Sequence, residues 1–373
     1  MTKVTGHLVL VDSVEDGTIT VEDGVIATVE TGTSSAAADP STPYITPGFV
    51  DVHVHGGGGH DAMGGRDDLD GMARTLLRRG VTSFLPKAVS APLPALSAFV
   101  ARVREWLLDA PTDGAAALGA NLEGPFLAAA RRGAHDPAHL IVPADFSAAD
   151  LEPLVDGLRL ITIAPELPGA AEMIGWFVAR GVAVSLGHSA ATLEEARAGY
   201  LAGATGTTHL FNAMSGLAHR SPGLAAAALL DDDVWVELIA DGLHVDPGLW
   251  PLITRLKPAD RLVLVSDAVA VAGTGDGVGR LGGLEVEVRG GRVTLAGTST
   301  LAGSMLSLDE AVRRLVAVGI GLPAAVAAAS RNPLALIGVT DRGRLAVGQR
   351  ADLVELDDDL GVRRVMRAGS WQG

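Results

Sequence analysis

Short apolar runs alternate with longer segments of helical periodicity through most of the chain. Eight of the runs are rich in β-forming residues: ITPGFVDVHVH, VTSFLPKAV, AALGANLEG, LRLITIAPE, VAVSLGHS, TGTTHLF, WVELIADGLHV and RLVLVSDAVA. The segments between them, such as DLDGMARTLLRRG and TLEEARAGYLAG, have the spacing of amphipathic helices. Eight strand–helix units over roughly 250 residues are typical of a (β/α)8 TIM barrel. A doubly wound open sheet is the alternative fold.

Both ends of the chain carry a different pattern, in which apolar and polar residues alternate. HLVLVD and GTITVEDGVIATVE lie near the N-terminus, with Gly17 and Asp23–Gly24 as turn signals, and GRLAVGQRADLVELDDDLGVRRVMRAG lies near the C-terminus. Strands at opposite ends of a chain pair only where the termini meet. We therefore expect a small β-sandwich domain built from residues 1–46 and 339–373, with the catalytic barrel at residues 47–338.

Composition narrows the function classes. The 373 residues are 48% hydrophobic and include no cysteine, which fits a globular protein without disulfides or thiolate metal ligands. The net charge of −15, with only 29 lysines and arginines, argues against a nucleic-acid partner. One small phosphorylated ligand would need only a local cluster of donors. The chain shows no secretion signal and no apolar run long enough for a bilayer, so we expect a cytoplasmic enzyme without a membrane partner.

Polar side chains gather at the C-terminal ends of the predicted strands. In a barrel these ends open on one face, where active sites are built. Residues far apart in sequence would therefore converge on one mouth. In chain order they are His53, His55, Glu123, His188, His209, His244 and Asp267.

The pair His53 and His55 is the clearest sign of metal binding. Residues i and i+2 of a strand project from the same face, so both imidazoles can reach one ion. Glycines 56–59 then allow a tight turn. An isolated H-x-H pair is more often a hydrogen-bonded core feature, but the convergence of the other strand ends favours a metal.

Imidazole and carboxylate ligands without thiolates suit Zn²⁺, and also Fe²⁺, Co²⁺ or Mn²⁺. As the single carboxylate among four histidines, Glu123 could bridge two ions. His53 and His55 would complete one site and His188 and His209 the other. Two ions would lower the pKa of a shared water toward neutrality, and Asp267 would take its proton and return it to the leaving group. The other role for Asp267 is a metal ligand or a helix cap.

Several motifs together resemble the N-acetylglucosamine-6-phosphate deacetylases of the amidohydrolase superfamily. They are PGFVDVHVHG, NLEGPF, LGHSAAT, THLFNAM, DGLHVD, VSDAVA and LAGSMLSLDEAVR, with a superfamily-like tail NPLALIG…GRLAVGQRADLVELD. The resemblance covers nearly the whole chain in order. It implies hydrolysis of the acetamide of a phosphorylated amino sugar. Some family members replace the H-x-H pair by amides and use a single metal, so the chain could hold one or two ions.

The resemblance also assigns roles to single residues. It gives Glu123, His188 and His209 as the shared metal ligands and Asp267 as the general base and acid. His135 would polarise the acetyl carbonyl. His244 would reach the site of a neighbouring subunit, which implies a homodimer. The substrate-binding residues that it implies are Ala134, Asn212, Ala213, Arg220, His244, Leu301, Ala302 and Gly303.

Other interpretations remain open at this stage. The same metal core could serve an N-acetylgalactosamine-6-phosphate deacetylase, a D-aminoacylase or a dihydroorotase, and an inactive sugar-phosphate sensor is a further alternative. Lys87 lies at the end of the second strand and has no role in the resemblance; it either faces the mouth or is solvated. The G-x-G-x-x-G at Gly277–Gly282 precedes a strand-like run, so we interpret it as a loop entering a hairpin and not as a dinucleotide site.

Overall fold

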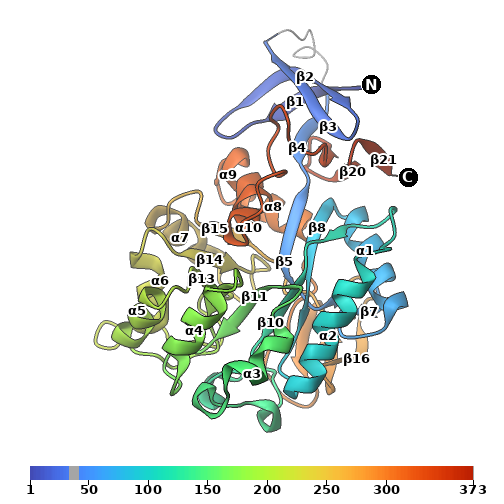
Figure 1. Ribbon diagram of the computed structural model, residues 1–373. Coiled ribbons are helices and arrows are strands. Elements are labelled where there is room, and N and C mark those ends of the chain that lie inside the picture. Colours follow the sequence, from blue (N-terminus) through green and yellow to red (C-terminus); the bar gives the residue numbers. More distant parts are fainter. Residues whose placement is uncertain (33–41, 373) are drawn as a thin grey trace.

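The computed structural model describes residues 1–32 and 42–372. Its central feature is a nearly closed barrel of eight parallel strands (Figure 1). The hydrogen-bonded order runs β15, β14, β13, β12, β11, β10, β8 and β5. Their bounds are β5 (Phe49–Val54), β8 (Val81–Ala88), β10 (Ala120–Glu123), β11 (Leu158–Ile163), β12 (Ala183–Leu186), β13 (Gly206–Thr207), β14 (Trp235–Leu238) and β15 (Leu262–Leu264). The predicted TIM barrel is therefore confirmed.

The segment after β15 joins the two ends of this sheet. The amide of Asp267 donates to the carbonyl of His53 at 2.9 Å, and the amide of His55 donates to the carbonyl of Ala268 at 2.8 Å. Because β5 carries His53, this closure places the end of β15 beside the H-x-H pair. Every residue of β5 and β8 is buried, as expected of parallel strands covered on both faces.

Helices between the strands cover the barrel. Helix α5 shows why they begin where they do, since Thr192 and Glu195 form a reciprocal capping box at its N-terminus. The α-helices are α1 (Arg66–Arg78), α2 (Leu93–Trp106), α3 (Ala148–Leu151), α4 (Ala170–Val178), α5 (Leu193–Leu201), α6 (Gly223–Leu230), α7 (Trp250–Leu256), α8 (Leu308–Ala317), α9 (Leu322–Ala328) and α10 (Arg331–Leu336). The short strand β9 (Ala116–Ala117) pairs with β8, and β6 (Gly56–Gly57) and β7 (His60–Asp61) pair with each other. No helix in the described residues is both long and apolar enough to cross a membrane.

A small β domain is built from both chain ends, as predicted, and both termini lie beside it (Figure 1). Seven strands form one sheet in the order β21, β20, β19, β4, β1, β2, β3. The N-terminal β4 pairs antiparallel with the C-terminal β19, where Thr46 faces Val354. These strands are β1 (Thr2–Val9), β2 (Val14–Glu22), β3 (Val25–Thr31), β4 (Tyr44–Pro47), β19 (Leu353–Leu356), β20 (Val362–Arg367) and β21 (Ser370–Gln372). Residues 33–41 of the predicted N-terminal segment lie outside the described residues.

The two turn signals of this segment have different outcomes. Asp23 and Gly24 form the turn between β2 and β3, and both have positive φ. Gly17 lies inside β2 instead. A side chain there would meet the carbonyl oxygen of Glu30 at 2.4 Å. Glycine is therefore needed because the backbones of β2 and β3 approach closely, and not because the chain turns.

A third sheet follows β15 and lies beside the barrel. It consists of β16 (Gly277–Leu281), β17 (Leu284–Arg289) and β18 (Arg292–Leu295), paired antiparallel. The predicted hairpin is present, but the segment interpreted as a loop is its first strand, which begins at Gly277. The turn lies at Gly282–Gly283, where both glycines have positive φ. This sheet contributes to a separate apolar cluster that reaches Val89 and Ala134 on barrel loops.

Candidate metal centre and substrate cavity

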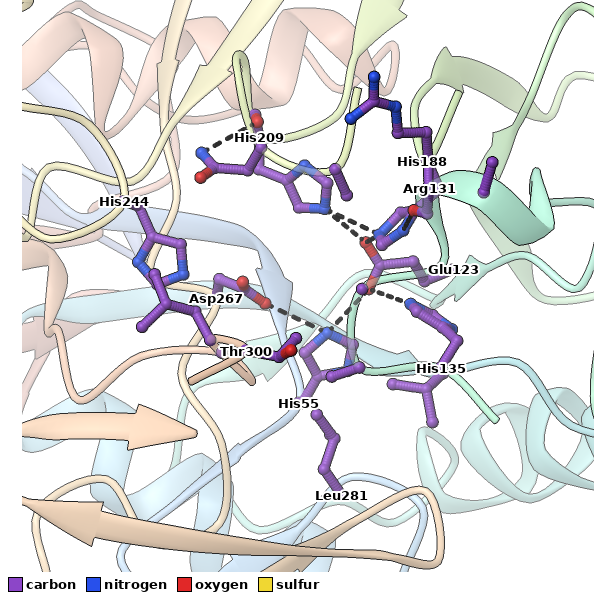
Figure 2. A pocket seen from close by; sticks show the side chains of 18 residues that line it. His55, Glu123, Arg131, His135, His188, His209, His244, Asp267, Leu281 and Thr300 are labelled. Atoms are coloured by element: carbon purple, nitrogen blue, oxygen red, sulfur yellow. Dashed lines mark hydrogen bonds and ion pairs between the residues drawn. The ribbon is translucent and has the colours of Figure 1, made fainter. Parts of the chain in front are cut away.

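A cavity of about 370 Å³ opens at the C-terminal ends of the barrel strands (Figure 2). Glu123 is the last residue of β10 and His53 lies within β5. The residues that follow their strands within three positions are His55, His188, His209 and Asp267. The barrel therefore brings the polar residues of the strand ends together at one cavity, as the sequence predicted. The cavity is lined by His55, Val89, Glu123, Ala130, Arg131, Gly133, Ala134, His135, His188, His209, Asn212, Ala213, His244, Asp267, Leu281, Thr300, Leu301 and Gly303.

One group of ligand atoms surrounds the first oxygen of Glu123. Oε1 lies 3.1 Å from Nε2 of His188 and 3.0 Å from Nε2 of His209. The two Nε2 atoms are themselves 3.0 Å apart. Three possible metal-ligand atoms therefore face one another at nearly equal distances.

A second group surrounds the other oxygen of Glu123. Oε2 lies 3.1 Å from Nε2 of His55 and 3.6 Å from Nε2 of His53. Oδ1 of Asp267 lies 3.1 Å from Nε2 of His53 and 3.3 Å from Nε2 of His55. Glu123 is thus shared between the two groups, the position that the sequence predicted for it.

The hydrogen bonds of the Nδ1 atoms show which imidazoles can be ligands. Nδ1 of His53 faces the Glu237 carboxylate at 2.8 Å, and Nδ1 of His55 faces the carbonyl of Lys87 at 3.1 Å. Nδ1 of His188 faces the carbonyl of Arg131 at 2.9 Å. Oxygen acceptors of this kind require the proton on Nδ1, which leaves the Nε2 lone pair free for a metal.

His135 has the opposite arrangement. Its Nδ1 accepts from the backbone amide of Ser90 at 3.1 Å, so in the neutral ring the proton is on Nε2. That Nε2 lies 3.7 Å from Oε2 of Glu123. Although the ring stands within ligand distance of Glu123 and His188, it therefore presents an N–H donor to the cavity. This is the form that a residue polarising a carbonyl needs.

The charges of the centre favour a cation. Burial raises the pKa of Glu123, yet Lys87 and His53 hold it well below its usual range. Burial likewise raises the pKa of Asp267, and the neighbouring His53 and His55 hold it well below the usual value. Both carboxylates are charged at neutral pH. For His135, burial together with the nearby His188 lowers the pKa well below the usual value, so this ring stays neutral.

The donor set fits a divalent metal. Zinc–nitrogen bonds of about 2.0–2.1 Å arranged tetrahedrally separate the ligand atoms by about 3.3 Å, close to the 3.0–3.1 Å of the first group. Burial lowers the pKa of His53, as does Lys87, but the surrounding carboxylates raise it well above its usual value. The negative potential that favours a proton there also favours a metal cation.

The backbone is strained where it carries the site. His188, His209 and Asp267 have φ of 46°, 31° and 51°, and Ala213 has φ of 46°. Left-handed backbone at residues other than glycine costs about 1–2 kcal/mol each. The backbone is thus turned sharply two or three positions after three barrel strands, and the side chains of His188, His209 and Asp267 point across the mouth (Figure 2).

Most of the substrate-binding residues implied by the resemblance lie at the cavity. Ala302 is buried behind the lining, in the cluster formed with the β16–β18 sheet. His244 lines the cavity of its own chain, and its Nδ1 contacts Asp241 at 2.7 Å. Arg220 is exposed and is not among the lining residues. Those at the cavity are Ala134, Asn212, Ala213, His244, Leu301 and Gly303.

Sequence reasoning missed the residues that hold the ligands from behind. Glu237, in the middle of β14, accepts from Nδ1 of His53 and from the amide of His209 at 3.1 Å. Asp51 accepts from the amide of His53 at 3.1 Å, and burial raises its pKa to about 6. A carboxylate inside an apolar strand was the available signal in both cases, in WVELIA and in GFVDVHV.

The barrel, the shared carboxylate and the Nε2 donors define a metal-dependent hydrolase of the (β/α)8 class. The amidohydrolase family pattern matches residues 44–371, and the chain belongs to this family. It is similar to the N-acetylgalactosamine-6-phosphate deacetylase of Escherichia coli O157:H7, with 39% identity over 95% of this chain and 94% of that protein. It is 40% identical to the N-acetylglucosamine-6-phosphate deacetylase of Bos taurus over 88% of this chain and 83% of that protein.

A solved structure shows the same fold. It is the N-acetyl-D-glucosamine-6-phosphate deacetylase of Mycobacterium smegmatis, determined as a mutant in complex with N-acetyl-D-glucosamine-6-phosphate. The TM-score is 0.91 at 36% identity, covering 99% of this chain and 98% of that one. The resemblance seen in the sequence motifs is confirmed, and the D-aminoacylase and dihydroorotase alternatives are not favoured.

Proposed function

We propose that this protein hydrolyses the acetamide of N-acetylglucosamine 6-phosphate to glucosamine 6-phosphate and acetate. The observation that best supports this is the difference between the Nδ1 partners of the imidazoles. Nδ1 of His188 and Nδ1 of His55 face backbone carbonyls, which leaves their Nε2 lone pairs for an ion. Nδ1 of His135 faces a backbone amide, so this ring directs an N–H into the same cavity. An acyl-transfer site needs both kinds of nitrogen, because water must be activated and the developing oxyanion must be stabilised.

The residues divide the reaction among them. Glu123, His188 and His209 would hold the ion, with His53 and His55 as further ligands, and zinc suits this donor set best. A divalent ion lowers the pKa of bound water and polarises a carbonyl. Asp267 accepts the proton when water adds to the carbonyl carbon, and it delivers that proton to the amine nitrogen as the C–N bond breaks. The N–H of His135 donates to the carbonyl oxygen.

Three lining residues are suited to the sugar phosphate. Asn212, Ala213 and His244 line the cavity together with the metal centre. His244 is oriented by Asp241, which leaves its other nitrogen for a ligand. The homodimer and the cytoplasmic location remain predictions from the sequence.

A panel of sugars tests the assignment. We expect metal-loaded protein to release acetate from N-acetylglucosamine 6-phosphate, and far less from the unphosphorylated sugar. N-Acetylgalactosamine 6-phosphate belongs in the panel because one relative carries that name; a higher kcat/KM for it would move the assignment to the galacto sugar. Asp267→Asn should keep its metal and lose turnover. Full turnover by that variant, or equal rates with and without phosphate, would contradict the proposal.

A further inference from the structure

Lys87 is buried inside the metal centre. Its side chain is fully inaccessible, and Nζ lies 3.4 Å from Oε1 of Glu123. The same Nζ lies 2.9 Å from Nε2 and 3.1 Å from Nδ1 of His53. Of the two predictions for Lys87, solvation is therefore wrong, and its side chain lies in the barrel interior.

The two distances to His53 show how the ammonium lies. An atom almost equally far from both ring nitrogens at this range lies against the face of the ring and not along either lone pair. Nε2 of His53 therefore keeps its direction toward Asp267 and Oε2 of Glu123. The positive charge of Lys87 nevertheless stands 2.9 Å from that ligand atom.

The charges around the imidazoles balance with a single ion. Asp51 lies behind them and accepts from the backbone amide of His53. The carboxylates in the described residues that contact the rings themselves are three, those of Glu123, Asp267 and Glu237. One ammonium and one divalent cation neutralise them. A second divalent ion would leave a buried excess of positive charge, which is unfavourable in a low-dielectric interior.

We propose that the ammonium of Lys87 takes the place of a second metal ion. The protein then holds one ion tightly at Glu123, His188 and His209, and the group of His53, His55 and Asp267 binds another only weakly. Nζ of Lys87 lies 3.4 Å from Oε1 of Glu123 in the first group. It lies closer, at 2.9 Å, to Nε2 of His53 in the second group, so the stronger repulsion falls on the second ion. The inference depends on the metal centre and not on the identity of the sugar.

Metal stoichiometry tests this without any activity measurement. Metal-free protein is equilibrated with Zn²⁺ at rising free concentrations, and bound zinc per chain is measured by mass spectrometry of the metal. Wild type should saturate one tight site. Lys87→Met should bind a second ion roughly 100-fold or more tightly than wild type does. Adding His53→Asn to Lys87→Met should abolish the gain and so locate the second ion.

Lys257→Met is the matched control, because this second buried lysine donates to the backbone carbonyls of Ala228 and Asp231. It should bind zinc as wild type does, and Lys87→Arg, which keeps the charge, should too. Two tight ions in wild type would overturn the proposal even if Lys87→Met failed to fold. A folded Lys87→Met with one ion only would also overturn it. Failure of the sugar panel would leave these outcomes unaffected.

Discussion

At the scale of single residues, the five imidazoles of the centre differ in what their Nδ1 atoms contact. His53 and His188 have oxygen acceptors at Nδ1, a carboxylate and a carbonyl, and their Nε2 atoms are free to bind metal. His135 has a backbone amide there instead and keeps its proton on Nε2. Residue type alone does not separate a ligand from a donor. The neighbour at Nδ1 does so for His53, His55, His188 and His135, whereas Nδ1 of His209 is buried without a hydrogen-bond partner among the described residues.

This difference predicts that variants of two histidines in one cavity differ in metal content. His135→Ala should lower kcat roughly 100- to 1000-fold, the effect of losing one oxyanion donor, and should leave the bound metal unchanged. His188→Ala should lose metal affinity as well as turnover. Metal content and kcat measured on the same samples separate the two. Metal loss in His135→Ala would show that this ring is a ligand and that its inferred protonation is incorrect.

The sequence predicted the residues of the candidate metal centre but not the residues that orient them. His53, Glu123 and Asp267 could be found because polar residues at the ends of apolar strands share one face of a barrel. Glu237 was not singled out, and Lys87 was named without a role, because the importance of both lies in contacts with residues far away in sequence. Glu237 lies 184 positions from the imidazole that it orients. Such pairs exist only once the barrel has brought β5 and β14 together.

At the scale of elements, the barrel strands position the metal centre, whereas the β16–β18 sheet supports one wall of the substrate cavity. Leu281 of β16 lines the cavity and packs in the same apolar cluster as Val89 and Ala134. Val286 of β17 is fully buried in this cluster but does not line the cavity. The apolar contacts of the β16–β18 sheet therefore support the cavity wall, whereas the barrel strands support the metal ligands.

Truncating Val286 should consequently affect substrate binding more than metal binding. We expect Val286→Ala to lower the free energy of unfolding by about 1–2 kcal/mol, since it leaves a small cavity. KM for the sugar phosphate should rise several-fold while metal content stays unchanged. Val278→Ala on β16 is the control, because that side chain is 67% exposed. Metal loss in Val286→Ala with wild-type KM would show that the sheet supports the metal centre instead.

Element prediction from the sequence succeeded where the pattern was repeated. All eight apolar runs contain a barrel strand, although β13 is reduced to Gly206–Thr207. The three-stranded sheet was harder to recognise, since the glycines of β16 imitate a loop. Gly279 lies inside that strand, and its place is kept by glycine because a side chain there would meet Cγ1 of Val271 at 2.3 Å. In a sequence, a glycine required by such a close approach cannot be distinguished from a glycine required by a turn.

At the scale of the whole molecule, the cavity of one chain contains some but not all of the residues implied for the phosphate. His244, which the resemblance assigned to a neighbouring subunit, already lines the cavity of its own chain. Arg220 is exposed outside it, and Leu217 on the same loop is 53% exposed. An arginine fork matches phosphate geometry well. If the predicted homodimer forms, Arg220 is therefore the residue that we expect one copy to supply to the other.

Mixed dimers test this arrangement directly. Arg220→Ala alone should raise KM for the phosphorylated sugar far more than for the unphosphorylated one, and Asp267→Asn alone should be inactive. In a dimer of the two variants, the site with an intact Asp267 receives Arg220 from the other chain. Because random exchange makes about half of the dimers mixed, refolding the variants together should restore low-KM turnover. Turnover at the high KM of Arg220→Ala, or a monomeric wild type, would show that Arg220 acts in its own chain or not at all.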